Sequence, residues 1–148
     1  MSTPTPTDVL MAQAANENRG AHEFLVLWNR YCHAIDDLID ADHRPDPDDL
    51  LAVFMQAAVL YSHPFYQAHS AHLVAVVATV TNTYADSVRM ERMEGWPKQT
   101  ADVLRFCGND MVCAVAFITG GYAHMRHISG QLRFVSQQEH HDEEGNPR

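Results

Sequence analysis

The stretch from Phe24 to Ile39 repeats apolar residues every three or four positions, and this spacing constrains the fold more than any other feature. The apolar residues are Phe24, Leu27, Trp28, Tyr31, Cys32, Ile35, Leu38 and Ile39. Side chains at this spacing lie on one wide face of an α-helix. We therefore predict a helix over about 21–42 that buries this face against other helices.

The rest of the chain predicts further helices separated by turn residues. We expect a short helix from Thr7 or Asp8 to about 18, stopped near Gly20, and helices over about 48–62, 66–93 and 101–134. Thr100 is placed to cap the last helix, and Gly120-Gly121 to kink it. The β-branched run 76–83 also fits a strand, but a lone strand would have no partner. The sequence thus predicts an all-α fold, a single-domain bundle of four to five helices.

Length and composition agree with one globular domain. The chain has 148 residues, of which 46% are apolar and 20% charged, and this size is enough to bury a core. We assign residues 1–136 to the bundle, with residues 1–6 as a flexible leader. Residues 137–148 are predicted to form a polar, disordered tail.

The acidic balance limits the possible partners. Ten Lys and Arg stand against nineteen Asp and Glu, a net charge of −9, which argues against nucleic acid and anionic membranes. A small phosphorylated molecule or a metal ion fits better. No apolar run reaches the roughly 18 residues of a membrane span, so we predict a cytoplasmic protein. A homodimer is plausible, because short helices can leave an apolar face uncovered.

Polar residues form a stripe inside the predicted helix 21–42. Asn29, His33, Asp36 and Asp40 lie at i, i+4, i+7 and i+11, on one side of the helix, with Asp37 beside them. Two like charges at i and i+4 repel each other, so a divalent cation is a sensible compensation, and oxygen ligands suit magnesium or manganese. In the alternative interpretation these aspartates simply face water near the helix end.

A second polar stripe lies on the predicted helix 66–93. Thr79, Asn82, Asp86 and Arg89 are spaced at i, i+3, i+7 and i+10 beside an apolar face. We expect that this stripe can face the stripe on the predicted helix 21–42. The alternative, considered equally good, is that Asn82 and Asp86 form hydrogen bonds between helices.

These motifs carry a resemblance to a known family. The sequence Tyr31-Cys32-His33-Ala34-Ile35-Asp36-Asp37-Leu38-Ile39-Asp40 resembles the first aspartate-rich motif of squalene and phytoene synthases, which are isoprenoid synthases. The segment 81–86 with Glu91 and Arg92 is similar to their second motif. The resemblance implies magnesium ions on Asp36, Asp40 and Asp86 that hold a prenyl diphosphate. The chain length and helix count resemble instead the all-α nucleotide pyrophosphohydrolases, including MazG-like proteins.

Together these observations predict a magnesium-dependent protein that binds or processes a diphosphate-containing small molecule. His33 or Asp37 is the candidate general base for a hydrolytic reaction. Asn29, Arg30, Asn82 and Arg89 are candidate substrate-binding residues, with the arginines toward the phosphates. The alternative is a non-catalytic bundle that sequesters a ligand or joins an oligomer through its apolar helices, without a metal site.

Overall fold

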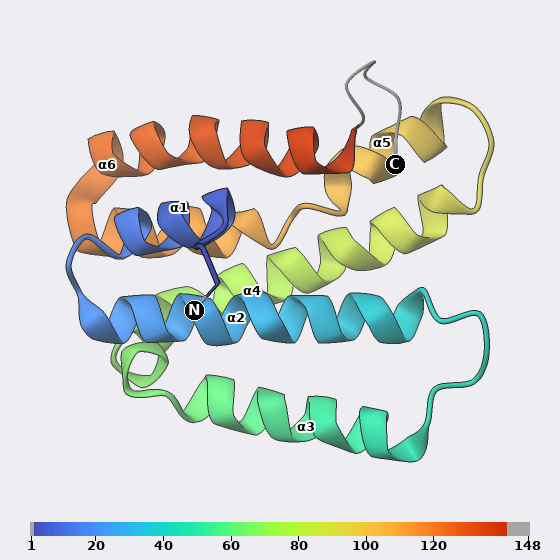
Figure 1. Cartoon of the computed structure of the whole chain (residues 1–148), viewed down its shortest axis with the longest axis horizontal. Coiled ribbons are helices and arrows are strands. Elements are labelled where there is room, and N and C mark those ends of the chain that lie inside the picture. The colour runs from blue at the N-terminus through green and yellow to red at the C-terminus, as the bar shows by residue number, and fades with distance from the viewer. Residues whose placement is uncertain (1, 142–148) are drawn as a thin grey trace.

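The computed structural model describes residues 2–141 and confirms an all-α single-domain bundle (Figure 1). The described residues contain no β-strand, and the run 76–83 is helical. There are six helices in this part of the chain, because the predicted last helix is two separate elements. They are α1 (Pro6–Ala15), α2 (Arg19–Ile39), α3 (Pro47–Ser62), α4 (Pro64–Glu91), α5 (Trp96–Leu104) and α6 (Asn109–His140).

The boundary between α1 and α2 differs from the prediction. α1 starts at Pro6, inside the predicted leader, because Thr5 caps it and Asp8 completes a capping box. The helix ends at Ala15, not near Gly20, since Asn16 and Glu17 adopt left-handed backbone angles. Asn18 then caps α2 through its side chain, so Gly20 lies inside α2.

The predicted boundary between α3 and α4 is confirmed. Asp46 caps α3 ahead of Pro47. His63 caps α4 ahead of Pro64, and its Nδ1 accepts a hydrogen bond from the amide of Phe65 at 3.1 Å. The backbone leaves helical geometry once within α4, at His69.

The predicted start of the last helix at Thr100 is wrong. α5 begins at Trp96, after Gly95, because Pro97 is already favourable in the first turn of a helix. Thr100 lies inside α5, where its hydroxyl donates to the carbonyl of Trp96. The turn 105–108 then separates α5 from α6.

The pair Gly120-Gly121 does more than kink α6, because the helix reverses direction there. The side-chain amide of Asn109 donates to the hydroxyl of Ser136 at 2.9 Å, although the two residues are 27 positions apart. A continuous helix would separate them by roughly 40 Å. Gly121 has φ 82° and ψ −177°, a conformation open only to glycine. The two arms of α6, 109–120 and 122–140, therefore run side by side (Figure 1).

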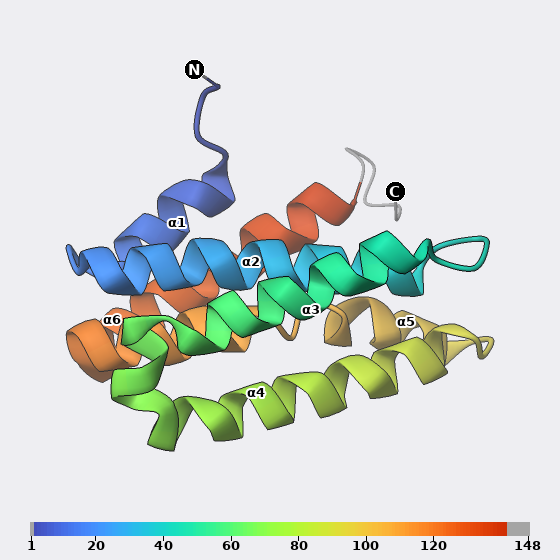
Figure 2. The same ribbon diagram turned by 90° about the horizontal axis from the view of Figure 1, so that it is seen from below.

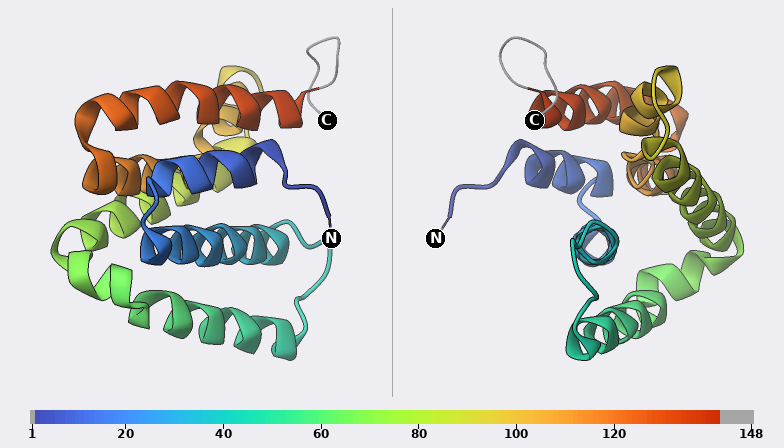
Figure 3. Two further views of the ribbon diagram at one scale, coloured as in Figure 1. Left: turned by 60° about the vertical axis from the view of Figure 1, so that its left-hand side comes forward. Right: turned by 90° about the vertical axis from the view of Figure 1, so that its right-hand side faces the viewer.

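The helices pack around α2, which contacts α1, α3, α4 and α6. In end view α2 is central, with α1 and α6 above it, α4 beside it and α3 below (Figure 3). Phe24, Leu25, Met111, Ile128 and Leu132 are completely buried at the contacts between these helices. α3 lies at the edge of the bundle and contacts only α2 and α4 extensively (Figure 2).

The C-terminal helix bears on two further predictions. α6 continues to His140, four residues past the predicted domain end, and the predicted tail residues 142–148 lie outside the described residues. The helical stretch 96–139 is long and apolar enough to span a membrane by composition, with 33% of its most apolar window buried. The turn 105–108 and the reversal at Gly121 interrupt this stretch. Localisation therefore stays a prediction.

Candidate functional site

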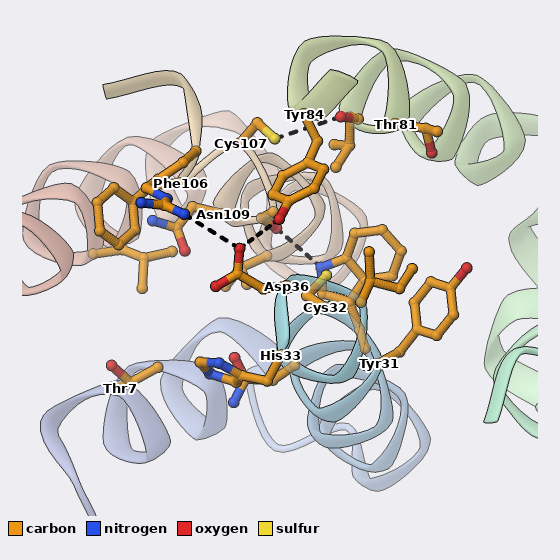
Figure 4. A pocket seen from close by; sticks show the side chains of 18 of the residues that line it. Thr7, Tyr31, Cys32, His33, Asp36, Thr81, Tyr84, Phe106, Cys107 and Asn109 are labelled. Atoms are coloured by element: carbon orange, nitrogen blue, oxygen red, sulfur yellow. Dashed lines mark hydrogen bonds and ion pairs between the residues drawn. The ribbon is translucent and has the colours of Figure 1, made fainter. Parts of the chain in front are cut away.

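A cavity of about 400 Å³ lies among α1, α2, α4 and both arms of α6, next to the turn 105–108 (Figure 4). Its size is at the lower end of the range of small-molecule sites. Most of its wall is apolar, and the charged side chains Asp36, Asp40 and Arg105 lie together in what we call the polar end of the cavity. The lining residues used below are Met11, Trp28, Asn29, Tyr31, Cys32, His33, Asp36, Asp40, Tyr84, Arg105, Phe106, Asn109 and Leu132.

The turn 105–108 is held in place by hydrogen bonds from two neighbouring helices. The indole Nε1–H of Trp28 donates to the carbonyl of Gly108 at 3.0 Å. The thiol of Cys107 donates to the carbonyl of Val80 at 3.4 Å. A side chain on this turn is consequently fixed relative to both α2 and α4, which matters for Arg105.

Arg105 is the centre of the polar end of the cavity. Its guanidinium donates to Asp40 at 3.0 Å and to Glu91 at 3.2 Å, and lies 3.6 Å from Asp36. Asp36 also accepts a hydrogen bond from the Tyr84 hydroxyl. The side chain of Arg105 is only 20% exposed, whereas its three carboxylates are 38–48% exposed. We call these five residues, Asp36, Asp40, Tyr84, Glu91 and Arg105, the Arg105 cluster.

The pKa values of Arg105 and Tyr84 follow from burial and from the neighbouring charges. Burial lowers the pKa of Arg105, but Glu91, Asp36 and Asp40 together raise it above its usual value, so the guanidinium stays charged. Burial and the hydrogen bond to Asp36 raise the pKa of Tyr84 well above its usual value, so its hydroxyl remains a donor. Three carboxylates surround one guanidinium, and the cluster is net negative by two charges.

The thiol of Cys32 lies in the same cavity wall, one residue from Tyr31. Burial raises the pKa of this thiol from 9.0 to about 12, with smaller contributions from Cys107 and Asp36. The three cysteines are free in the structure. Cys32 is therefore a neutral thiol in an apolar wall.

The first predicted stripe lies where the sequence placed it. Asn29, His33, Asp36 and Asp40 all line the cavity, as expected for residues on one side of α2. Asp37 and Arg30 are exposed and do not belong to the cavity wall. Of the two candidate bases, only His33 is thus at the cavity.

The second predicted stripe faces away from the cavity. Asn82, Asp86 and Arg89 are exposed, and none lines the cavity. Tyr84 also lies on α4, and its side chain points to Asp36 of α2. Residues two positions apart, such as Tyr84 and Asp86, lie about 200° apart around a helix. Asp86 therefore lies on the opposite side of α4, and Glu91 approaches the cluster from this helix instead.

The three predicted metal ligands are consequently not brought together. Asp36 and Asp40 are neighbours, but Asp86 is on another surface. Across residues 2–141, no group of three His, Cys, Asp or Glu side chains is arranged to hold a metal ion. The like-charge repulsion that led us to predict a cation is compensated by Arg105.

Sequence reasoning missed Arg105 and its partner Glu91, and it missed Tyr84, whose hydroxyl donates to Asp36. A signal was present, because Arg105 interrupts the apolar run between Val103 and Ile118. A charged residue in such a run needs a partner when it is partly buried. Asn109 was not singled out as a site residue, yet it lines the cavity and its side-chain amide donates to the hydroxyl of Ser136.

Comparison with known proteins adds no assignment to this geometry. No family model, no curated protein and no solved structure matches the chain. The resemblances to isoprenoid synthases and pyrophosphohydrolases remain predictions from short motifs and helix count.

Proposed function

We propose that this protein binds a small organic amine, with the apolar body of the ligand in the cavity and its ammonium group at the Arg105 cluster. This is the ligand-sequestering alternative from the sequence, with a chemical class added. The observation on which it depends is the surplus of carboxylates at the polar end of an otherwise apolar cavity.

The shape and chemistry of the cavity support a small amphipathic ligand. An apolar wall with a few polar groups gathered at one end is the usual composition of a small-molecule site. Met11 and Leu132 supply aliphatic surface from helices at the two ends of the chain. Asn29 and Asn109 add amides able to orient a polar group.

The charge of the cluster favours a cation over an anion. Three carboxylates already surround Arg105, so a phosphate or carboxylate ligand would meet their repulsion. An ammonium group is instead attracted by these carboxylates. Asp36 and Asp40 each have one oxygen that takes no part in the bonds to Arg105 and Tyr84 and can accept from the ligand. Binding a cation there reduces the net negative charge instead of increasing it.

Aromatic rings provide a second reason for a cation. Trp28, Tyr31, Tyr84 and Phe106 all line the cavity. The face of an aromatic ring attracts an ammonium group, and such contacts contribute about 0.5–2 kcal/mol, more where water is excluded. Figure 4 shows Tyr84 and Asp36 approaching one another from facing helices, so that ring and carboxylate adjoin the same space.

The test uses Trp28 as an internal reporter. The chain has two tryptophans, and Trp96 is 71% exposed and outside the cavity, so a Trp96→Phe variant reports on Trp28 alone. We expect decylamine to change this fluorescence saturably. Decanoate has the same chain length and the opposite charge, and its affinity should be lower by about tenfold or more.

Neighbouring aspartates on α2 provide the matched control. Asp36→Asn should weaken decylamine binding about tenfold, while Asp37→Asn, outside the cavity, should leave it within about twofold. Equal binding of decylamine and decanoate would contradict the proposal. A saturable response to magnesium with a diphosphate, lost in Asp36→Asn, would instead support the metal-site prediction.

A further inference from the structure

The outer face of α3 is an apolar surface that no other part of residues 2–141 covers. Residues 50–61 include no charged side chain, and Gln56 is the only strongly polar one apart from the hydroxyl of Tyr61. A helix that is apolar on all sides is normally surrounded by protein. Within the described part of the chain only one side of α3 is covered, where Leu60 is buried against the neighbouring helices.

The uncovered side forms a continuous stripe. Its large members are Leu51, Phe54, Met55 and Val59, which are 61%, 72%, 64% and 50% exposed. They are spaced at i, i+3, i+4 and i+8, so they lie on adjacent turns of one face. Ala58 lies among them and is also exposed. We call these five residues the α3 stripe.

We infer that the α3 stripe is the contact surface of a homodimer, in which α3 packs antiparallel against α3 of a second copy. The stripe exposes on the order of 500 Å² of apolar surface, at the upper end of what a monomer normally shows. Pairing two copies would bury on the order of 1,000 Å² before the polar rim is counted, which is the threshold for a specific interface.

The distribution of charge favours a second copy as the partner and an antiparallel orientation of the two α3 helices. The protein has a net charge of −9, so two copies repel each other over most of their surface, but residues 50–61 are free of charge. Absence of charge at the centre, with Phe and Met present, is typical of an interface core. Asp46, Asp48 and Asp49 lie at the start of α3, and a parallel pair would place six carboxylates together. An antiparallel pair separates them.

The geometry is self-complementary, as a two-fold axis requires. In an antiparallel pair centred on the stripe, Met55 of one copy meets Met55 of the other at the axis. Leu51 of each copy then meets Val59 of the other. No residue of α3 lines the cavity, so the inference does not depend on the proposed ligand. Figure 3 shows α3 on the side of α2 that faces away from α1 and α6.

The experiment measures mass in solution by sedimentation equilibrium at tens of micromolar protein. The wild type should have twice the 16.7 kDa of the chain. Met55→Glu and Phe54→Glu should raise the dissociation constant about 100-fold, because each buries an unpaired charge at the contact. Phe134→Glu is the matched control, since Phe134 is 68% exposed on α6, and it should remain dimeric. Circular dichroism checks that each variant is folded.

A mixing experiment tests for a second copy directly. Met55→Glu and Met55→Lys should each be monomeric alone and should form a mixed dimer when combined, because opposite charges then meet at the axis. A monomeric wild type, dissociation by Phe134→Glu equal to that by Phe54→Glu, or no mixed dimer would each overturn the inference. A monomeric wild type that binds neutral lipid vesicles through Phe54 would assign the stripe to a membrane instead.

Discussion

Two polar stripes with similar spacing lie on neighbouring helices, but they face in opposite directions: one faces the cavity and the other faces solvent. On α2, Asp36 and Asp40 turn toward the cavity and contact Arg105. On α4, Asn82, Asp86 and Arg89 turn toward solvent. The difference teaches that spacing along a helix gives a shared side but not the direction in which that side faces. That direction depends on which side has more apolar surface to bury.

Removing the central cation should produce the largest difference between the two stripes. Arg105→Met leaves three neighbouring carboxylates without their shared partner, and we expect the free energy of unfolding to fall by about 2 kcal/mol. Arg89→Met, on the exposed stripe, should change it by less than about 0.5 kcal/mol. Urea unfolding at pH 7 measures both values. Equal effects would mean that Arg105 is not the compensating charge.

Removal of one hydroxyl should have the next largest effect. Tyr84→Phe deletes the hydrogen bond that Asp36 accepts and should cost about 1.5 kcal/mol of unfolding free energy. Tyr122, 64% exposed on α6, is the matched control, and Tyr122→Phe should be close to neutral. If Tyr84→Phe were as mild as its control, the cavity side of α4 would not be the energetically important one.

A smaller effect is expected from pH on the side of α2 that faces the cavity, through the thiol of Cys32. Burial raises the pKa of Cys32 from 9.0 to about 12, so the thiol ionises in the unfolded chain before it ionises in the folded one. Its contribution to stability is complete below pH 9 and is lost as the pH rises from 9 to 12. Between pH 8 and pH 10 this loss is about 1 kcal/mol. Between these two pH values the free energy of unfolding of Cys32→Ala should fall by about 1 kcal/mol less than that of the wild type. Urea unfolding at both pH values measures this difference.

The smallest effect is expected on the exposed stripe. Asp86→Asn should alter the unfolding free energy by no more than about 0.5 kcal/mol, because Asp86 is exposed and outside the cavity. The melting temperature with and without magnesium should also be unchanged relative to wild type. A magnesium-dependent stabilisation that Asp86→Asn removes would show that the two stripes act together after all.

The helical fold was predictable because its signals are local. The apolar spacing from Phe24 to Ile39 predicted α2, and the predicted break between the helices 48–62 and 66–93 is found at His63 in the structure. Boundaries failed where a second local signal competed. Pro97 starts α5 ahead of Thr100, and Asn16 and Glu17 end α1 ahead of Gly20.

The site was predictable only on the helix with one clear apolar side. On α4 both sides mix polar and apolar residues, so the sequence did not show that Tyr84, and not Asp86, would face α2. Arg105 is 65 residues from Asp40 in the chain, and its position depends on the turn between α5 and α6. The reversal at Gly121 was likewise predicted only as a kink, because packing determines how far it turns.

The first and last helices close the fold together, and this has a consequence for biosynthesis. Thr119 donates to the carbonyl of Ala14, 105 residues earlier, and Thr7 of α1 contacts Glu139 near the end of α6. Met11 and Leu132 from these two helices also complete the wall of the cavity. While the chain is being translated, α1 therefore has no such partner until α6 has been synthesised. A nascent chain that stops before α6 lacks part of the cavity wall, so the cavity can close only after this helix is made.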